Sequence, residues 1–178
     1  MAAQVLPGAS ANDGSIGSLR PVPINEIMRI FVRKPGFLLA RTDQVSNALY
    51  GALSRGGETL AQAEMLLTIA SDDGRDQVGL ARANGIDTST TAIILDNLEL
   101  TGLVSRVPDK KDRRRSLPTL TEEGQRRIPA VAADFAALQE ELLSGNAAQE
   151  RGRLIDLLGR IGRENAGERH DGITRLAP

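Results

Sequence analysis

Residues 76–124 read DQVGLARANGIDTSTTAIILDNLELTGLVSRVPDKKDRRRSLPTLTEEG, and this stretch decides the fold. Asp76 can cap a short helix that ends at Gly85, because aspartate accepts hydrogen bonds at helix starts and glycine adopts the left-handed conformation at helix ends. Asp87 or Thr88 can cap a second helix, in which apolar residues recur at helical spacing. Two short helices joined by a glycine-containing turn are typical of a helix-turn-helix.

The segment that follows the second helix predicts a β-hairpin. Residues 103–107 alternate as a strand, Pro108 begins a loop, and residues 116–120 return as a second strand. Pro118 has no N–H to donate, so the returning strand should lie at the edge of its sheet. A helix-turn-helix followed by a basic hairpin predicts a mostly α protein with a small β-hairpin wing, that is, a winged helix-turn-helix.

Basic residues gather in this hairpin, although the 178-residue chain carries a net charge of −1. Residues 106–115 contain six basic residues and two acidic ones. This segregation of charge predicts a small positively charged surface that can attract phosphates, on a protein that is otherwise acidic.

The order and spacing of these residues resemble the MarR family of transcriptional regulators. The resemblance covers roughly residues 36–162, and GIDTSTTAIILDNLELTGLV resembles the recognition helix of that family over its whole length. It implies a dimeric winged helix-turn-helix architecture, operator DNA as a partner and a small-molecule effector. The wing signature is carried by Asp112, Arg114, Leu120, Thr121 and Gly124.

The flanking segments carry apolar helical faces with no sheet to cover them. We therefore predict dimerisation helices at residues 24–58 and 121–163, which cover each other across a two-fold axis. The second segment carries a heptad seam, which is compatible with such packing. The winged helix-turn-helix lobe is expected at residues 59–120. Residues 1–23 are predicted to form a flexible arm and residues 164–178 a polar tail.

Hydroxyl side chains at the start of the second helix are candidates for contacts with bases and phosphates in the major groove. The alternative is that they are only cap residues and β-branched filler. Family members often carry arginine in the first turn and again near Asn97, and both are missing here, which shifts DNA contact to the wing.

By resemblance, Arg114 inserts into the minor groove and Asp112 pairs with an arginine to hold the wing, although a solvated charge run is the alternative. The predicted DNA-binding residues are Thr88, Ser89, Thr90, Thr91, Lys110, Lys111, Asp112, Arg113, Arg114 and Arg115.

The resemblance also implies a cleft between the dimer lobe and the DNA lobe that binds small aromatic or phenolic acids. Arg41 can hold a carboxylate through two hydrogen bonds, and Tyr50 can hydrogen-bond the same ligand. Arg75 lies in a loop expected beside this cleft, and His170 can contact a phenol if the tail folds back. The alternatives are a surface salt bridge for Arg41 and a core or interface ring with a solvated hydroxyl for Tyr50.

Composition excludes several other classes of function. The chain has no cysteine and one histidine, so disulfides, thiol redox sensing and a transition-metal site are not expected, and no cofactor is predicted. No nucleophile motif or glycine-rich phosphate loop supports an enzyme. No secretory leader pattern and no apolar run of about 18 residues is present, so the chain is predicted to be cytoplasmic, with no membrane partner.

The sequence therefore predicts a MarR-like homodimeric repressor that a small aromatic carboxylate or phenolic effector releases from a pseudo-palindromic operator. Three alternatives stay open. The first is a winged-helix adaptor that binds protein, the second is a constitutive DNA-binding regulator without a ligand, and the third is an activator. The arginine-rich hairpin favours DNA over a protein partner.

Overall fold

The structure is a computed structural model that describes Met28 and residues 31–71, 74–109 and 115–165. Contacts within the chain divide it into two units, residues 1–40 and 41–178, and the boundary falls inside one helix. Among the described residues, no helix is both long and apolar enough to span a membrane.

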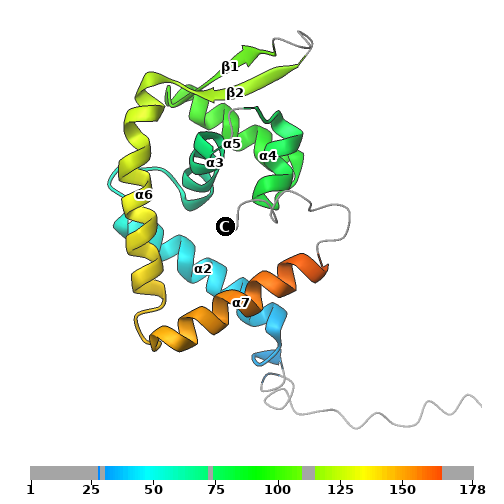
Figure 1. Ribbon diagram of the computed structural model, residues 1–178, viewed down its shortest axis with the longest axis vertical. Helices are drawn as coiled ribbons and strands as arrows, with labels where there is room; N and C mark the ends of the chain where they lie inside the picture. The colour runs from blue at the N-terminus through cyan, green and yellow to red at the C-terminus, as the bar shows by residue number, and fades with distance from the viewer. Residues whose placement is uncertain (1–27, 29–30, 72–73, 110–114, 166–178) are drawn as a thin grey trace, which may run out of the picture. The chain divides into compact units, whose positions relative to one another are not determined.

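The elements confirm the predicted fold class, which is mostly α with one β-hairpin (Figure 1). Two strands pair antiparallel in the order β1-β2, and Arg106 lies opposite Pro118 in the hairpin. The elements are α2 (Pro35–Leu53), α3 (Leu60–Ser71), α4 (Gln77–Asn84), α5 (Thr88–Leu100), β1 (Val104–Pro108), β2 (Ser116–Leu120), α6 (Glu122–Leu142) and α7 (Ala148–Asn165).

Local capping interactions begin and end these helices, and those of Asp76 and Gly85 are as predicted. Thr59 and Gln62 form a reciprocal capping box before α3, with the Thr59 N–H 2.9 Å from Gln62 Oε1. Asp76 Oδ1 accepts a hydrogen bond of 2.9 Å from the Gly79 N–H at the start of α4. Gly85 ends that helix with a φ of 66°, where a side chain would be strained.

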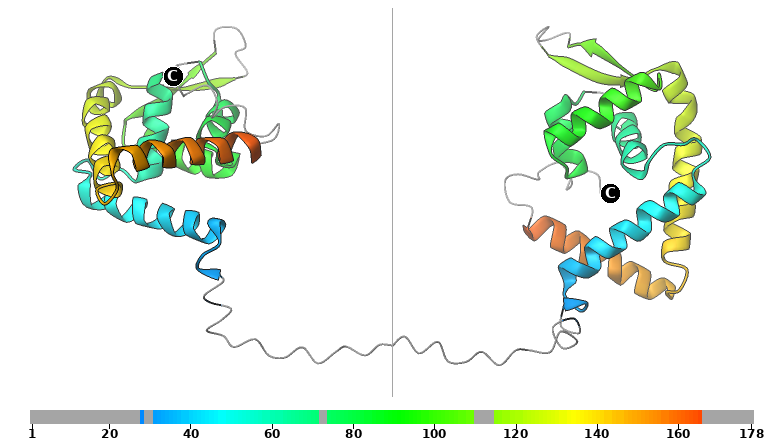
Figure 2. Two further views of the ribbon diagram at one scale, coloured as in Figure 1. Left: turned by 60° about the horizontal axis from the view of Figure 1, so that its bottom comes forward. Right: turned by 180° about the vertical axis from the view of Figure 1, so that it is seen from behind.

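Helix α3 is the centre of the winged lobe, by which we mean α3, α4, α5 and the hairpin. It packs against α4, α5 and β2, and also against α6 (Figures 1 and 2). Burial of its apolar side chains stabilises the lobe. The largest fully buried hydrophobic side chains of this core are Tyr50, Met65, Leu66, Ile69, Leu80, Leu95, Leu98, Val131 and Leu138.

Helix α7 differs from the core helices because none of its described side chains is buried. Leu154, Ile155, Leu157, Leu158 and Ile161 are each between 38% and 60% exposed. Within the described part of the chain, a stripe of this size on one helix is an apolar face that stays open to solvent.

The hairpin is joined to α6 through one close backbone approach. The Thr121 N–H donates to the Leu103 carbonyl at 3.1 Å, and the Thr121 hydroxyl donates to the Gly102 carbonyl at 2.6 Å. A Cβ atom placed on Gly124 would lie 2.1 Å from the same Leu103 oxygen. Only glycine allows α6 to start this close to the end of α5.

Replacing Gly124 with alanine should destabilise the fold by about 1–3 kcal/mol, because the new methyl group must displace backbone atoms. Urea unfolding at fixed protein concentration measures this change. The matched control is Gly51→Ala in α2, where an added Cβ meets no atom within 4 Å. That control should be neutral or stabilising by up to about 1 kcal/mol, since alanine favours helix. Equal stability of the two variants would contradict the proposed constraint.

A largely buried ion pair ties the loop before α3 to α6. Glu58 accepts two hydrogen bonds from Arg127, with Oε1 2.6 Å from Nε and Oε2 2.8 Å from Nη2. The two side chains are 7% and 21% exposed. A Cβ atom on Gly56 would lie 1.3 Å from Arg127 Nη2, so this glycine leaves the space for the guanidinium. Hydrogen bonding from Arg127 holds the pKa of Glu58 below its ordinary value of 4.5, although burial opposes the shift.

Glu58→Gln should lower the free energy of unfolding by about 3 kcal/mol at pH 7, because it leaves a largely buried guanidinium without its counter-charge. The folded pKa of Glu58 is depressed, so its contribution is present above about pH 4.5 and is lost as pH falls through the folded value. The difference between wild type and variant should therefore shrink in acid, which urea unfolding between pH 7 and pH 3 measures.

The matched control for this experiment is Glu123→Gln. Glu123 pairs with Arg126 at 2.6 Å, but both side chains are more than half exposed. Its loss should cost less than about 1 kcal/mol. A Glu58→Gln penalty that did not change with pH would contradict the ion-pair explanation.

Candidate functional site

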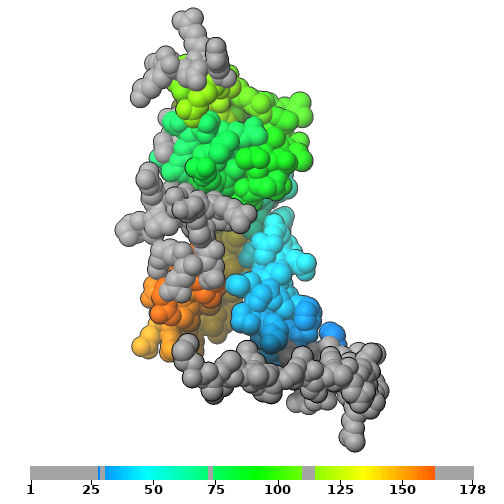
Figure 3. Space-filling view, turned by 90° about the vertical axis from the view of Figure 1, so that its right-hand side faces the viewer, coloured from blue at the N-terminus to red at the C-terminus, as the bar shows by residue number. Residues whose placement is uncertain are grey.

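Helices α4 and α5 and the hairpin present one continuous surface. The turn between the helices is held by the Ile86 N–H, which donates to the Ala81 carbonyl at 3.1 Å. Helix α5 packs on α3 and α4 on one side and on β1 at its end. Figure 3 shows α4 and α5, in shades of green, directly beside the hairpin. The second helix therefore stands on the surface with the wing next to it, which is the arrangement of a groove-reading helix.

The cap of α5 is Asp87, and its carboxylate is already occupied within the chain. Asp87 Oδ1 accepts from the Thr90 N–H at 2.9 Å, and Oδ2 accepts from the Thr90 hydroxyl at 2.6 Å. These bonds lower the pKa of Asp87 from its ordinary value. An ionised carboxylate at this helix start is unfavourable for a phosphate at the same N–H groups, although the sequence had suggested one.

The four predicted hydroxyl residues of α5 do not share one environment. Thr88, Ser89 and Thr90 are exposed. Thr91 is fully buried, and its hydroxyl donates to the Asp87 carbonyl at 2.9 Å. The placement of Thr91 among DNA contacts is therefore wrong, because that position faces the core of the lobe.

The charged residues of α5 are acidic and are paired with the hairpin. Arg106 of β1 donates to Asp96 Oδ1 at 2.6 Å and lies 3.1 Å from Glu99 Oε1. The sequence of α5, TSTTAIILDNLEL, contains no lysine or arginine. Arg106 thus balances the acidic residues of α5 and joins the strand to the helix.

Among the predicted DNA-binding residues of the wing, Arg115 is the one that the structure describes. Its guanidinium lies 2.5 Å from Asp76 Oδ2, and its carbonyl accepts from the Asp109 N–H at 2.9 Å. The pKa of Asp76 is lowered first by the hydrogen bond from Gly79 and then by Arg115. Arg115 therefore links the base of the wing to the cap of α4. The other predicted wing residues, Lys110, Lys111, Asp112, Arg113 and Arg114, lie outside the described residues.

The predicted ligand residues do not converge on one place. Arg41 is exposed, whereas Tyr50 is fully buried, and burial raises the pKa of its phenol. They are nine residues apart on α2, or about two and a half turns, so they lie on opposite sides of the helix about 13 Å apart along its axis. The prediction that they hold the same small ligand is therefore wrong. Arg75 is half-buried in the loop before α4, and His170 lies outside the described residues.

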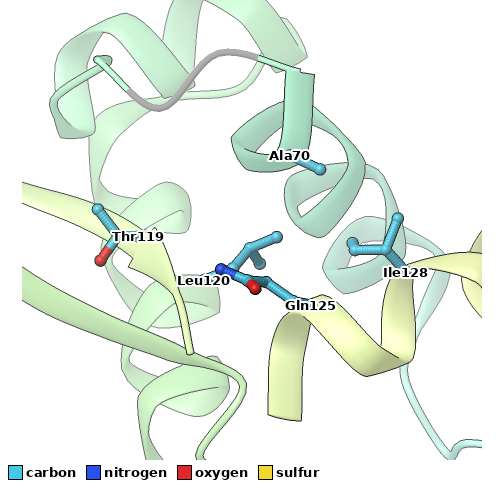
Figure 4. A pocket seen from close by; sticks show the side chains of 5 residues that line it. All are labelled: Ala70, Thr119, Leu120, Gln125 and Ile128. Atoms are coloured by element: carbon cyan, nitrogen blue, oxygen red, sulfur yellow. The ribbon is translucent and has the colours of Figure 1, made fainter. Parts of the chain in front are cut away.

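A cavity of about 460 Å³ lies where α3, β2 and α6 meet, and sequence patterns did not indicate it. Ala70, Thr119, Leu120, Gln125 and Ile128 line it (Figure 4). Its wall mixes apolar side chains with one amide and one hydroxyl. Within the described segments, no group of three His, Cys, Asp or Glu side chains could hold a metal ion.

Comparison with known proteins identifies the family. The sequence model described as MarR family matches residues 57–115. YdgJ of Bacillus subtilis, an uncharacterised HTH-type transcriptional regulator, is 31% identical over 105 residues, which cover 59% of this chain and 64% of YdgJ. The match thus spans just under two thirds of that relative.

Solved structures extend the likeness over most of the chain. The PcaV transcriptional regulator from Streptomyces coelicolor, in complex with its natural ligand, is 30% identical with a TM-score of 0.69, over 75% of this chain and 94% of PcaV. A MarR mutant from E. coli complexed with operator DNA is 27% identical with a TM-score of 0.67, over 79% of this chain and 98% of that one. The hairpin motif, the helix before it and the fold thus agree, and this chain belongs to the MarR family of transcriptional regulators.

Proposed function

We propose that this member of the family is a homodimeric repressor that binds a pseudo-palindromic DNA operator. The observation that carries the proposal is the shared surface of α5 and the hairpin, where six of the 22 lysines and arginines of the chain fall within residues 106–115. The E. coli MarR mutant, which has the same fold, is complexed with operator DNA. Two-fold symmetry would place the half-sites about one helical turn of DNA apart, or a multiple of it.

Attraction to phosphates would come from the tip of the wing rather than from its base. Arg106 and Arg115 are engaged with acidic side chains of α5 and of the α4 cap. The remaining basic residues of the segment are therefore the proposed phosphate and minor-groove contacts, with Arg114 in the minor groove. These residues are Lys110, Lys111, Arg113 and Arg114.

A second copy of the chain is the proposed cover for the apolar face of α7. Five large apolar side chains on that helix are exposed, and such faces are seldom left in contact with water. The DNA-binding form would then carry two recognition helices at a fixed spacing. That spacing is the quantity an effector can change.

Arg114→Ala should weaken binding to the DNA upstream of the protein's own gene more than binding to random duplexes, because an arginine in the minor groove favours narrow, A·T-rich sequence. It should also reduce the slope of log affinity against log salt by about 1 per protomer, because one cation is removed from the negative potential of the DNA. Fluorescence anisotropy at 50 and 200 mM salt measures both effects.

Arg126→Ala is the control for this measurement. Arg126 is an exposed arginine of α6 that pairs with Glu123 and lies outside the basic segment 106–115, so the salt slope should not change. Wild-type protein that bound no DNA at either salt concentration would favour the protein-binding adaptor.

We further propose that a small aromatic or phenolic acid releases the DNA. PcaV, 30% identical to this chain, forms a complex with its natural ligand, which supports a small-molecule site in this architecture. Arg41 is the candidate for a carboxylate, because its exposed guanidinium can donate two parallel hydrogen bonds. The effector must favour the non-binding geometry by about 1–3 kcal/mol to release the operator usefully.

Arg41→Ala should therefore weaken binding of the effector but leave the affinity for the operator unchanged. A panel of phenolic acids is titrated into the protein–DNA complex, and the concentration that gives half release should rise at least tenfold for the variant, since a bidentate charge-assisted contact is lost. Arg55→Ala, at an exposed arginine after α2, is the control. DNA binding that no compound altered would favour a constitutive regulator.

A further inference from the structure

The outward face of α5 has an unusual chemistry for a helix that reads DNA. Thr91, Ile94, Leu95 and Leu98 are buried, which fixes the inward side of the helix. The opposite side presents Ser89, Ile93 and Asn97 at intervals of four residues, so that neighbouring side chains lie about 5–6 Å apart. These three residues form what we call the reading stripe of α5.

Each member of the reading stripe is exposed. Ile93 is 62% exposed in the centre of the helix, and Ser89 and Asn97 are also exposed one turn before and after it. A single exposed apolar side chain is ordinary on a protein surface. What distinguishes Ile93 is its place on the face of α5 that the proposed function turns toward DNA, where it can meet an apolar group of a base.

The bases that such a stripe can recognise follow from its chemistry. Guanine is read mainly by the paired donors of arginine or lysine, and α5 contains neither residue. Arg106 of β1 is held by Asp96 and Glu99. Arg82 of α4 lies beside Asp87 and Thr88, at the start of α5. Thymine, in contrast, offers a methyl group that only apolar side chains favour, and adenine offers a donor and an acceptor that match the amide of asparagine.

We propose that α5 selects A·T pairs, with the Ile93 side chain against the 5-methyl group of a thymine and the Asn97 amide on a neighbouring adenine. This inference rests on the proposed DNA-binding function and specifies which sequence the operator half-site contains. Affinity would come from the cationic wing, and sequence selection from a helix that carries no lysine or arginine.

The first test is selection of bound duplexes from a random library by the full-length protein. We expect two inverted half-sites with A·T pairs at the positions beneath the reading stripe. Enriched half-sites with G·C pairs at those positions would overturn the inference but leave the proposed function intact. Failure to enrich any sequence would overturn the proposed function and the inference with it.

The second test removes only the methyl group of the selected thymine, by replacing it with deoxyuridine. Wild-type protein should bind the uridine duplex about fourfold more weakly for each half-site changed, which corresponds to one buried methyl group. Ile93→Ala should bind the two duplexes equally. Because Ile93 is largely exposed, this variant should keep the wild-type melting curve, which circular dichroism checks.

Leu100→Ala is the matched control, because Leu100 is an apolar residue of the same helix and is 85% exposed. It lies seven residues beyond Ile93, about 10 Å further along the axis and away from the helix start that enters the groove. This variant should retain the fourfold preference for thymine. No preference in wild type, or a preference that survives in Ile93→Ala, would show that Ile93 does not read the methyl group.

Discussion

The approach of Gly124 to the Leu103 carbonyl is the contact on which the winged lobe depends. That single oxygen accepts the Thr121 N–H, and it leaves no room for a side chain at Gly124. Leu103 follows the end of α5 and precedes β1, while Thr121 follows β2 and caps α6. Three elements therefore meet through backbone atoms, whose geometry varies far less than that of side chains. The helix, the wing and the start of α6 should move as one body.

This rigidity explains how a small molecule could act on the DNA-binding surface. Gln125 and Ile128 line the cavity between α3, β2 and α6, and they lie within the first two turns that follow the junction. A ligand that changed the tilt of α6 would therefore carry α5 and the hairpin with it. The ion pair of Glu58 and Arg127 holds the same part of α6 to the loop before α3, so it limits which tilts are accessible. The distance between the recognition helices of the two protomers could therefore change while the structure inside each winged lobe stays the same.

How far the sequence could predict this structure depends on how local each interaction is. The caps at Asp76 and Thr121 were predictable, because a side chain that bonds a backbone N–H three residues later leaves a short, characteristic pattern. The burial of Thr91 could not be predicted in this way, because four successive hydroxyl residues do not show which of them faces the core. The pair of Glu58 and Arg127 joins residues 69 positions apart, and no single-sequence pattern indicates such a contact. The lining of the cavity likewise comes from three elements that only tertiary packing brings together.

The distribution of charge divides the work of recognition between two parts of the lobe. A recognition helix that carried arginine would add both affinity and guanine selection, and the two effects could not be varied separately. In this chain Arg106 balances the acidic residues of α5, and Arg115 is held by the cap of α4. We propose that non-specific attraction comes from the wing tip and not from this helix. Selection by methyl contact is weak at one base pair, at about fourfold, but a two-fold symmetric dimer applies it twice, which gives about sixteenfold. Weak contacts that symmetry repeats can thus select the operator without strengthening binding to non-specific DNA.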